Sequence, residues 1–273
     1  MDSAKIKNYI LIVLLLLNAC LAALVLIRFT DSRASARAME QSTLEILAQK
    51  GIAVTGPVDL LAKPGASVPV SRDAAQERDC ASRLLSGASG SDQGGGSIMY
   101  TGKSGQAVFR GTGEFELLMT DSSVRLGRSP SATGARLMRR LGMSGSAANA
   151  RVSQDDSSAT VVLQAEYEGR PILNCEVTFT FTGSRLLLAV GRRPLHVAGT
   201  GSDAAVDAST ALMRALALLT RDGQTCTELQ GLSPCYVLDC DAAGDGTLTP
   251  VWRIETDVRT ILISAVTGEP VAI

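Results

Sequence analysis

The chain has 273 residues, of which 26 are Lys or Arg and 27 are Asp or Glu, so its formal net charge is −1. A balanced charge provides no field that steers a protein toward nucleic acid, and an aromatic content of 4% argues against base-stacking platforms. Nucleic acid is therefore not an expected partner, and the length allows one sizeable or two small domains.

The first element is an apolar helix near the N-terminus. The run from Ile10 to Ile27 contains no charged side chain, and as a helix it would extend roughly 27 Å, close to the hydrocarbon thickness of a bilayer. We predict a cytoplasmic tail over residues 1–8 and a single transmembrane helix over residues 9–27, in contact with membrane lipid. Basic residues flank both ends and set no orientation. A long domain can be translocated regardless of that bias, so we expect the C-terminal domain to be extracytoplasmic.

Two processed forms are alternatives to a permanent anchor in the cell membrane. A cleaved signal peptide needs a small-x-small site after its apolar core, and no good site follows Ile27. Residues 17–20 (LNAC) resemble a lipobox, in which Cys20 would be lipidated. However, Asn18 fits that motif poorly and the apolar run continues beyond Cys20. The uncleaved anchor is the preferred interpretation, and lipidation of Cys20 stays open.

One face of the predicted transmembrane helix is suited to contact with another helix. Asn18 lies almost at its centre, where an amide seeks a hydrogen-bond partner because lipid offers none. Ala19 and Ala23 form a small-xxx-small pair which, with Ala22, lets two backbones approach closely. We predict that Asn18, Ala19, Ala22 and Ala23 bind a partner helix. The alternative is a plain anchor that tolerates Asn18.

The segment after the membrane helix reads as helices followed by short strands. Ser71 is the expected N-cap of a helix that ends near Leu85, and the glycine-rich residues 87–96 are expected to form a flexible loop. The other elements predicted here are a helix over residues 34–50, a strand over residues 52–55, and strands over residues 97–101, 106–110 and 114–119.

The second half of the chain shows a clearer β pattern. Cys175, Val177, Phe179 and Phe181 alternate with polar residues, which predicts a strand with one buried face. Trp252 is expected to fill core volume from a half-buried strand. The predicted elements are a polar connection over residues 128–133, helices over residues 135–141 and 203–219, and strands over residues 159–166, 172–181, 185–190, 235–240, 251–255 and 260–265.

Both halves thus read as a helix followed by antiparallel strands. We predict an α+β fold, in which one N-terminal transmembrane helix precedes an extracytoplasmic domain of antiparallel sheets with packed helices. The domain is expected to consist of two related subdomains. One is a membrane-proximal α+β subdomain over residues 28–130, and the other is a C-terminal α+β subdomain over residues 131–273.

The cysteines define no framework by their spacing. Five of the six lie beyond the predicted membrane helix, at Cys80, Cys175, Cys226, Cys235 and Cys240. The last three are close enough in sequence for a local disulfide, so the pairing stays open, although small buried thiols are the preferred interpretation. Paired C-x-x-C spacing is missing from the sequence, so structural zinc is not expected.

Catalytic motifs are also missing from the sequence. His196 is the one histidine, so a Ser-His-Asp triad would have to use it, and residues 142–146 (GMSGS) lack the last glycine of a nucleophile elbow. Residues 102–104 (GKS) fit a hairpin turn better than a phosphate loop. Residues 239–245 begin like a calcium loop but lack its later acids, so a solvated hairpin loop is the preferred interpretation there. We therefore expect no catalytic residue, no metal and no cofactor.

Several short motifs carry a resemblance to a known family. Residues 1–7 (MDSAKIK), followed by a leucine-rich helix with the step from Leu17 to Asn18, resemble the start of YycI proteins. Residues 168–174 (EGRPILN), which lead into an alternating strand, resemble the same family. The C-terminal residues 248–254 (LTPVWRI) and 265–269 (AVTGE) resemble its ending, and they are also similar to PepSY-type domains.

The resemblance spans nearly the whole chain. It implies a one-helix membrane protein, without enzyme activity, whose extracytoplasmic α+β domain acts with a YycH-like protein on a WalK-like sensor histidine kinase through protein contacts. Two other functions stay open. The protein would be a lipid-anchored or membrane-anchored ligand-binding protein in one, and a cell-wall hydrolase using acids in no recognised motif in the other.

Overall fold

A computed structural model describes residues 14, 17, 18 and 38–273. The chain divides into two compact units, Met1–Val54 and Thr55–Ile273. In the first unit the described part contains a helix over residues 38–49 and the short strand β1, Ala53–Val54. Among the described residues, no helix combines the length and the apolar character needed to cross a membrane. Most of the predicted transmembrane span, residues 9–27, lies outside the described residues.

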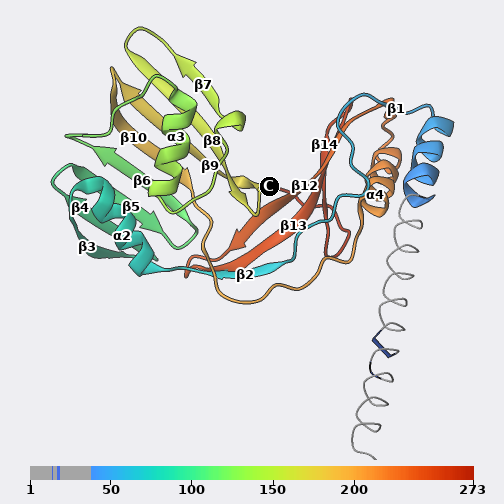
Figure 1. The fold of residues 1–273 in the computed structure, drawn as a ribbon, viewed down its shortest axis with the longest axis horizontal. Coiled ribbons are helices and arrows are strands. Elements are labelled where there is room, and N and C mark those ends of the chain that lie inside the picture. Colours follow the sequence, from blue (N-terminus) through green and yellow to red (C-terminus); the bar gives the residue numbers. More distant parts are fainter. Residues whose placement is uncertain (1–13, 15–16, 19–37) are drawn as a thin grey trace, which may run out of the picture. The chain divides into compact units, whose positions relative to one another are not determined.

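The second unit is a mixed α+β structure built mainly from antiparallel strands, as the sequence predicted (Figure 1). Its helices are α2 (Ala74–Leu85), α3 (Pro130–Arg140) and α4 (Ala208–Arg221), with a short 3-10 turn at Ala147–Asn149. Its strands are paired in two sheets, which β9 connects. We call them sheet I and sheet II.

Sheet I has the strand order β3-β4-β5-β6-β10-β9-β8-β7, and all of these pairs are antiparallel. Both α2 and α3 lie on one face of it (Figure 1). The strands are β3 (Ala88–Gly94), β4 (Ser97–Gly102), β5 (Gly105–Arg110), β6 (Glu114–Met119), β7 (Arg151–Gln154), β8 (Ser158–Tyr167), β9 (Arg170–Thr182) and β10 (Arg185–Arg192).

Sheet II has the strand order β11-β2-β13-β12, and β14 pairs with the C-terminal half of β13. Helix α4 packs against β13 and β14. The strands are β2 (Val68–Ser71), β11 (His196–Val197), β12 (Glu228–Cys240), β13 (Asp245–Thr256) and β14 (Thr260–Ser264). Strand β9 begins beside β12, where Ile172 pairs in parallel with Tyr236, and then continues into sheet I.

The core follows the predicted alternation. Cys175, Val177, Phe179 and Phe181 on β9 are completely buried, and the alternating residues of β8 lie beside them in the same cluster. The structure confirms that Trp252 is buried, and its indole Nε1 donates to the Val206 carbonyl at 2.9 Å. The expected turns at residues 102–104 and 239–245 are confirmed as hairpin connections between β4 and β5 and between β12 and β13.

Three local predictions were wrong. Ser71 ends strand β2, and the N-cap of α2 is Asp73, whose carboxylate accepts from the backbone N–H groups of Ala75 and Gln76. The glycine-rich segment 87–96 contains strand β3, because β4 supplies a ladder of backbone partners that glycine can use as well as any residue. The connection 128–133 already includes the first turn of α3, where Ser129 caps and Pro130 occupies the first position.

The predicted subdomain boundary between residues 130 and 131 lies in the first turn of α3, and strands from both sides of it pair with each other. Strand β6, before the boundary, pairs with β10, after it, where Leu118 faces Leu188. Likewise β2, before the boundary, pairs with β13 in sheet II. Each sheet therefore combines strands from both predicted subdomains.

Candidate functional site

One face of sheet I has no helix on it within the part of the chain that the structure describes. Helices α2 and α3 occupy the other face. On the open face three aliphatic side chains lie close together at the middle of the sheet. Leu118 on β6 is 38% exposed, and Leu187 and Val190 on β10 are 42% and 40% exposed. We call these three residues the aliphatic patch.

A β-bulge explains why two consecutive leucines of β10 face outward. Leu186 pairs with Phe181 and is buried, whereas Leu188 pairs with Thr180 across the same strand pair, so Leu187 is the extra residue of the bulge. An extra residue re-aims the side chains on either side of it. Leu188 on β10 is directly opposite Leu118 on the neighbouring strand β6, which places the bulge beside the rest of the patch.

A charged hollow of about 840 Å³ adjoins the aliphatic patch. Val190 lines it and is shared with the patch. Arg192 and Glu114, which are opposite each other in the β10–β6 register, line it as well. The remaining charged residues that line it are Arg110, Glu116 and Glu176. We call this the junction hollow, because Leu173 and Asn174, at the point where β9 leaves sheet II, complete its wall.

Arg192 connects the two sheets at the edge of the junction hollow. Its Nε donates to the Thr112 carbonyl at 2.8 Å, and its Nη2 contacts the Cys240 Sγ at 3.1 Å. The Cys240 thiol in turn donates to the same Thr112 carbonyl at 3.2 Å. The guanidinium is thereby held between the Thr112 carbonyl in the β5–β6 turn of sheet I and the Cys240 side chain at the end of β12 in sheet II.

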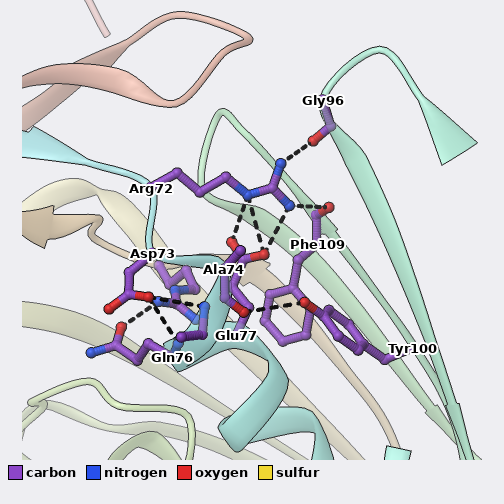
Figure 2. A network of polar contacts seen from close by, with 10 residues as sticks. Arg72, Asp73, Ala74, Gln76, Glu77, Gly96, Tyr100 and Phe109 are labelled. Carbon is purple, nitrogen blue, oxygen red and sulfur yellow. Dashed lines mark hydrogen bonds and ion pairs between the residues drawn. The ribbon is translucent and has the colours of Figure 1, made fainter. Parts of the chain in front are cut away.

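A second polar network fixes the chain where it passes from sheet II to helix α2 (Figure 2). Arg72, directly after β2, forms a two-pronged ion pair with Glu77 of α2, with Nε–Oε1 and Nη2–Oε2 distances of 3.0 and 2.8 Å. The same guanidinium donates to the carbonyls of Phe109 and Gly96. The Arg72 backbone N–H donates to the Gly244 carbonyl at 2.7 Å.

This ion pair is almost enclosed, because the side chains of Arg72 and Glu77 are 13% and 2% exposed. A charge buried to this degree is costly unless a partner and further hydrogen bonds compensate it, and here both are present. The network therefore holds the tip of the β12–β13 hairpin, helix α2 and strand β5 in one arrangement. The two sheets present the patch and the hollow as a preformed surface.

The buried thiols are structural in character. The five cysteines that the structure describes are all free. Four of them are buried, as the preferred interpretation of the sequence predicted, and Cys240 is half-buried. Burial raises the pKa of Cys175 to about 12, and burial together with a hydrogen bond to Asp257 raises the pKa of Cys226 to about 11. Burial also raises the pKa of Cys80, against the opposing charge of Arg193. These thiols stay protonated near neutral pH and are poor nucleophiles.

The acids whose pKa is shifted are engaged in turns and caps. Hydrogen bonds from Ser157 and Ser158 lower the pKa of Asp155 to about 2. Those from the backbone of Asp245 and Gly244 lower the pKa of Asp241, in the segment that imitates a calcium loop. A general acid needs a raised pKa instead. These carboxylates therefore serve local structure.

The structure places only one of the four predicted helix-contact residues. Asn18 is described as helical and exposed, whereas Ala19, Ala22 and Ala23, and also Cys20, lie outside the described residues. His196 is an exposed residue of β11, paired with Ser71. The predicted face thus stays a prediction.

Sequence reasoning missed both the aliphatic patch and the junction hollow. One signal for the patch is visible in residues 186–188 (LLL), because three leucines in a row cannot all face one side of a regular strand. The hollow had no such signal, because it forms from β5, β6, β9 and β10, whose proximity depends on the sheet order.

Comparisons with known proteins identify the fold and leave the family open. No protein-family model matches the chain, and no curated protein matches it. Twelve chains of solved structures do. An uncharacterized protein from Eubacterium rectale ATCC 33656 aligns with a TM-score of 0.52 and 11% identity, over 81% of this chain and 90% of that chain. The Bacillus megaterium YpeB C-terminal domain is a more distant structural neighbour, with a TM-score of 0.36, 8% identity, and coverage of 74% and 96%. At these identities the likeness concerns the fold alone.

Proposed function

We propose that the protein is a membrane-anchored extracytoplasmic regulator of a WalK-like sensor histidine kinase. It acts by protein contacts through its N-terminal helix and its folded domain, together with a YycH-like partner, and it is not an enzyme. The resemblance to YycI proteins suggests this function. One of the motifs that carry the resemblance, residues 168–174, supplies Leu173 and Asn174 to the junction hollow.

The observation that carries the proposal is the aliphatic patch on the open face of sheet I. An exposed cluster of aliphatic side chains rimmed by charges is typical of a protein interface, in which an apolar centre is surrounded by a polar rim. Leu118, Leu187 and Val190 provide the centre, and the charged residues of the junction hollow provide one rim. Arg192 is suited to bind a partner carboxylate because its guanidinium is already held in place.

The proposal is tested by crosslinking the full-length chain in its native membrane and identifying the proteins that co-purify. Recovery of a histidine kinase and a YycH-like protein supports it. A second arm compares the variants Leu187→Asp and Val190→Asp with Leu61→Asp, a leucine that is 46% exposed in the segment before β2. The patch variants should lose the partners at matched expression, and the control should keep them. Repeated purification without any membrane partner would contradict the proposal.

A further inference from the structure

Strand β14 has an outer edge that is only partly covered. Ser264 N–H donates to the Glu269 carbonyl at 2.8 Å, and Val271 N–H donates to the Leu262 carbonyl at 2.9 Å. Because backbone groups alternate along an antiparallel strand, Ser264, Leu262 and Thr260 all direct their N–H and C=O away from β13. In the described chain, the Leu262 N–H and both Thr260 backbone groups have no backbone partner on that side.

A groove lies beside this uncovered edge. It has a volume of about 590 Å³, and Thr260, Ile261 and Leu262 of β14 line it. A second hollow of about 330 Å³ extends it along α4, since the two share Leu218, Arg221 and Pro270. We call the two together the β14 groove.

Arginines dominate the charged lining of the β14 groove. Its charged residues are Arg214, Arg221, Arg253, Arg259, Asp222 and Glu269. Asp222 is shared, because its Oδ2 lies 2.6 Å from Arg259 Nη2 and its Oδ1 lies 3.6 Å from Arg221 Nε. One carboxylate cannot neutralise two guanidinium groups. Arg253 forms its own ion pair with Glu255, so Arg221 and Arg259, which share Asp222, carry the surplus charge. The side chain of Arg221 is also 74% exposed, so it is free to turn toward a ligand.

Apolar residues complete the groove at intervals. Leu173, Leu218 and Val271 line it, and Val271 also packs against the small core formed by Cys235, Val237 and Val251. An unpaired strand edge and apolar lining residues are what an added strand requires. The surplus arginines favour a strand that carries acidic side chains. The main chain provides hydrogen bonds, and alternate side chains of the ligand occupy pockets.

We propose that the β14 groove binds an extended acidic segment of a partner protein, which adds as a strand to Thr260–Leu262. Its carboxylates pair with Arg221 and Arg259, because a guanidinium is suited to two-pronged contacts with carboxylates. This inference does not depend on the identity of the partner, because the β14 groove shares no residue with the aliphatic patch and only Leu173 with the junction hollow. A negative result for the β14 groove would therefore leave the proposed function intact, and a negative result for the aliphatic patch would leave the groove proposal intact.

The test uses the full-length chain in lipid nanodiscs and fluorescent hexapeptides, acetylated and amidated, in which Glu alternates with Val. Binding is followed by fluorescence anisotropy. A Lys/Val peptide of equal length tests charge. Two N-methylated Glu/Val peptides, modified at odd or at even positions, test strand addition, because only alternate N–H groups of an added strand point to the edge.

The groove should bind the Glu/Val peptide, and the Lys/Val peptide about tenfold or more weakly. One N-methylated peptide should lose binding while the other keeps it. Arg221→Gln should weaken binding about tenfold, and Arg136→Gln, an exposed arginine on α3, should not. If Arg221→Gln does not fold, Arg259→Gln replaces it.

Three results would overturn the inference. Equal binding of the Glu and Lys peptides excludes recognition of carboxylates. Equal loss or equal retention by the two N-methylated peptides excludes an added strand. A wild-type chain that dimerises, and that becomes monomeric only in Arg221→Gln, would make a second copy of this chain the occupant.

Discussion

The side-chain carboxamide of Asn174 makes the two hydrogen bonds with the Leu238 backbone that a neighbouring strand would otherwise make. Its Nδ2 donates to the Leu238 carbonyl at 2.8 Å, and its Oδ1 accepts from the Leu238 N–H at 2.9 Å. These bonds lie where β9 leaves β12 and enters sheet I, so the backbone of β12 would otherwise lose its partner there. A side chain that both donates and accepts is needed at this branch point.

Asn174→Ala should therefore lower the free energy of unfolding by about 1–3 kcal/mol, because it leaves a partly buried N–H and C=O unpaired. Asn174→Asp should be similarly harmful, since a carboxylate cannot donate to the Leu238 carbonyl. Urea denaturation measures the change, and Gln230→Ala, at an exposed position of the same β12, serves as the control. A loss no larger than that of the control would show that the two bonds contribute little.

Trp252 offers a second test of the core. The indole is fully buried and Nε1 is bonded to Val206, so Trp252→Ala should cost about 3–5 kcal/mol through the cavity it creates. Trp252→Phe keeps an aromatic ring but leaves the Val206 carbonyl without its donor, and should cost less. Thermal and chemical denaturation of both variants provide the comparison. An unchanged melting temperature for Trp252→Ala would contradict burial in the core.

The stability of the folded domain should fall in acid partly through Asp257. Hydrogen bonds from Thr227 hold its pKa at about 2, below the ordinary value of 3.8. Because the folded-state pKa is lowered, the stabilisation is complete above the unfolded pKa and is lost as the pH falls from about 4 to about 2.

The measurement is the melting temperature across that range, compared between the wild type and Asp257→Asn. The wild type should lose more stability than the variant as the pH falls. Parallel curves would show that Asp257 is not linked to folding.

The predicted contact face of the membrane helix is tested by substitution. Asn18→Leu removes the amide while improving insertion, and Ala19→Leu or Ala23→Leu adds bulk that separates two backbones. All three should weaken co-purification with the kinase while insertion and folding persist. Leu17→Ile and Leu24→Ile, on the opposite side, should have no effect. Equal recovery for both sets at matched expression would leave the helix as an anchor only.

Local patterns in the sequence predicted the elements whose partners are adjacent in the chain. The alternation through Phe179 and Phe181 predicted β9 and its buried face because β8 and β10 adjoin it in sequence. The glycines of residues 87–96 indicated a loop, and β3 was therefore not predicted. A strand at the edge of a sheet can form although few of its side chains pack against the core. Ser71 and Asp73 both suit an N-cap, so the sequence did not distinguish them and the prediction chose Ser71 instead of Asp73.

Long-range features could not be predicted from the same patterns. Pairing of β2 with β13 joins residues such as Val70 and Gly246, and periodicity cannot specify a partner so distant in sequence. The junction hollow and the β14 groove depend on such pairings. Of the candidate surfaces, only the consecutive leucines at residues 186–188 left a local signal.

The most direct test of the central claim uses a photo-crosslinking amino acid in the full-length chain in its native membrane. It is placed at Leu187 in the aliphatic patch or at Leu61 as an equally exposed control, with 42% and 46% exposure. If the patch is a protein interface, irradiation should attach the Leu187 variant to a sensor histidine kinase or a YycH-like protein, and the Leu61 variant to neither. No adduct at Leu187, or equal adducts at both positions, would contradict the proposed regulatory contact.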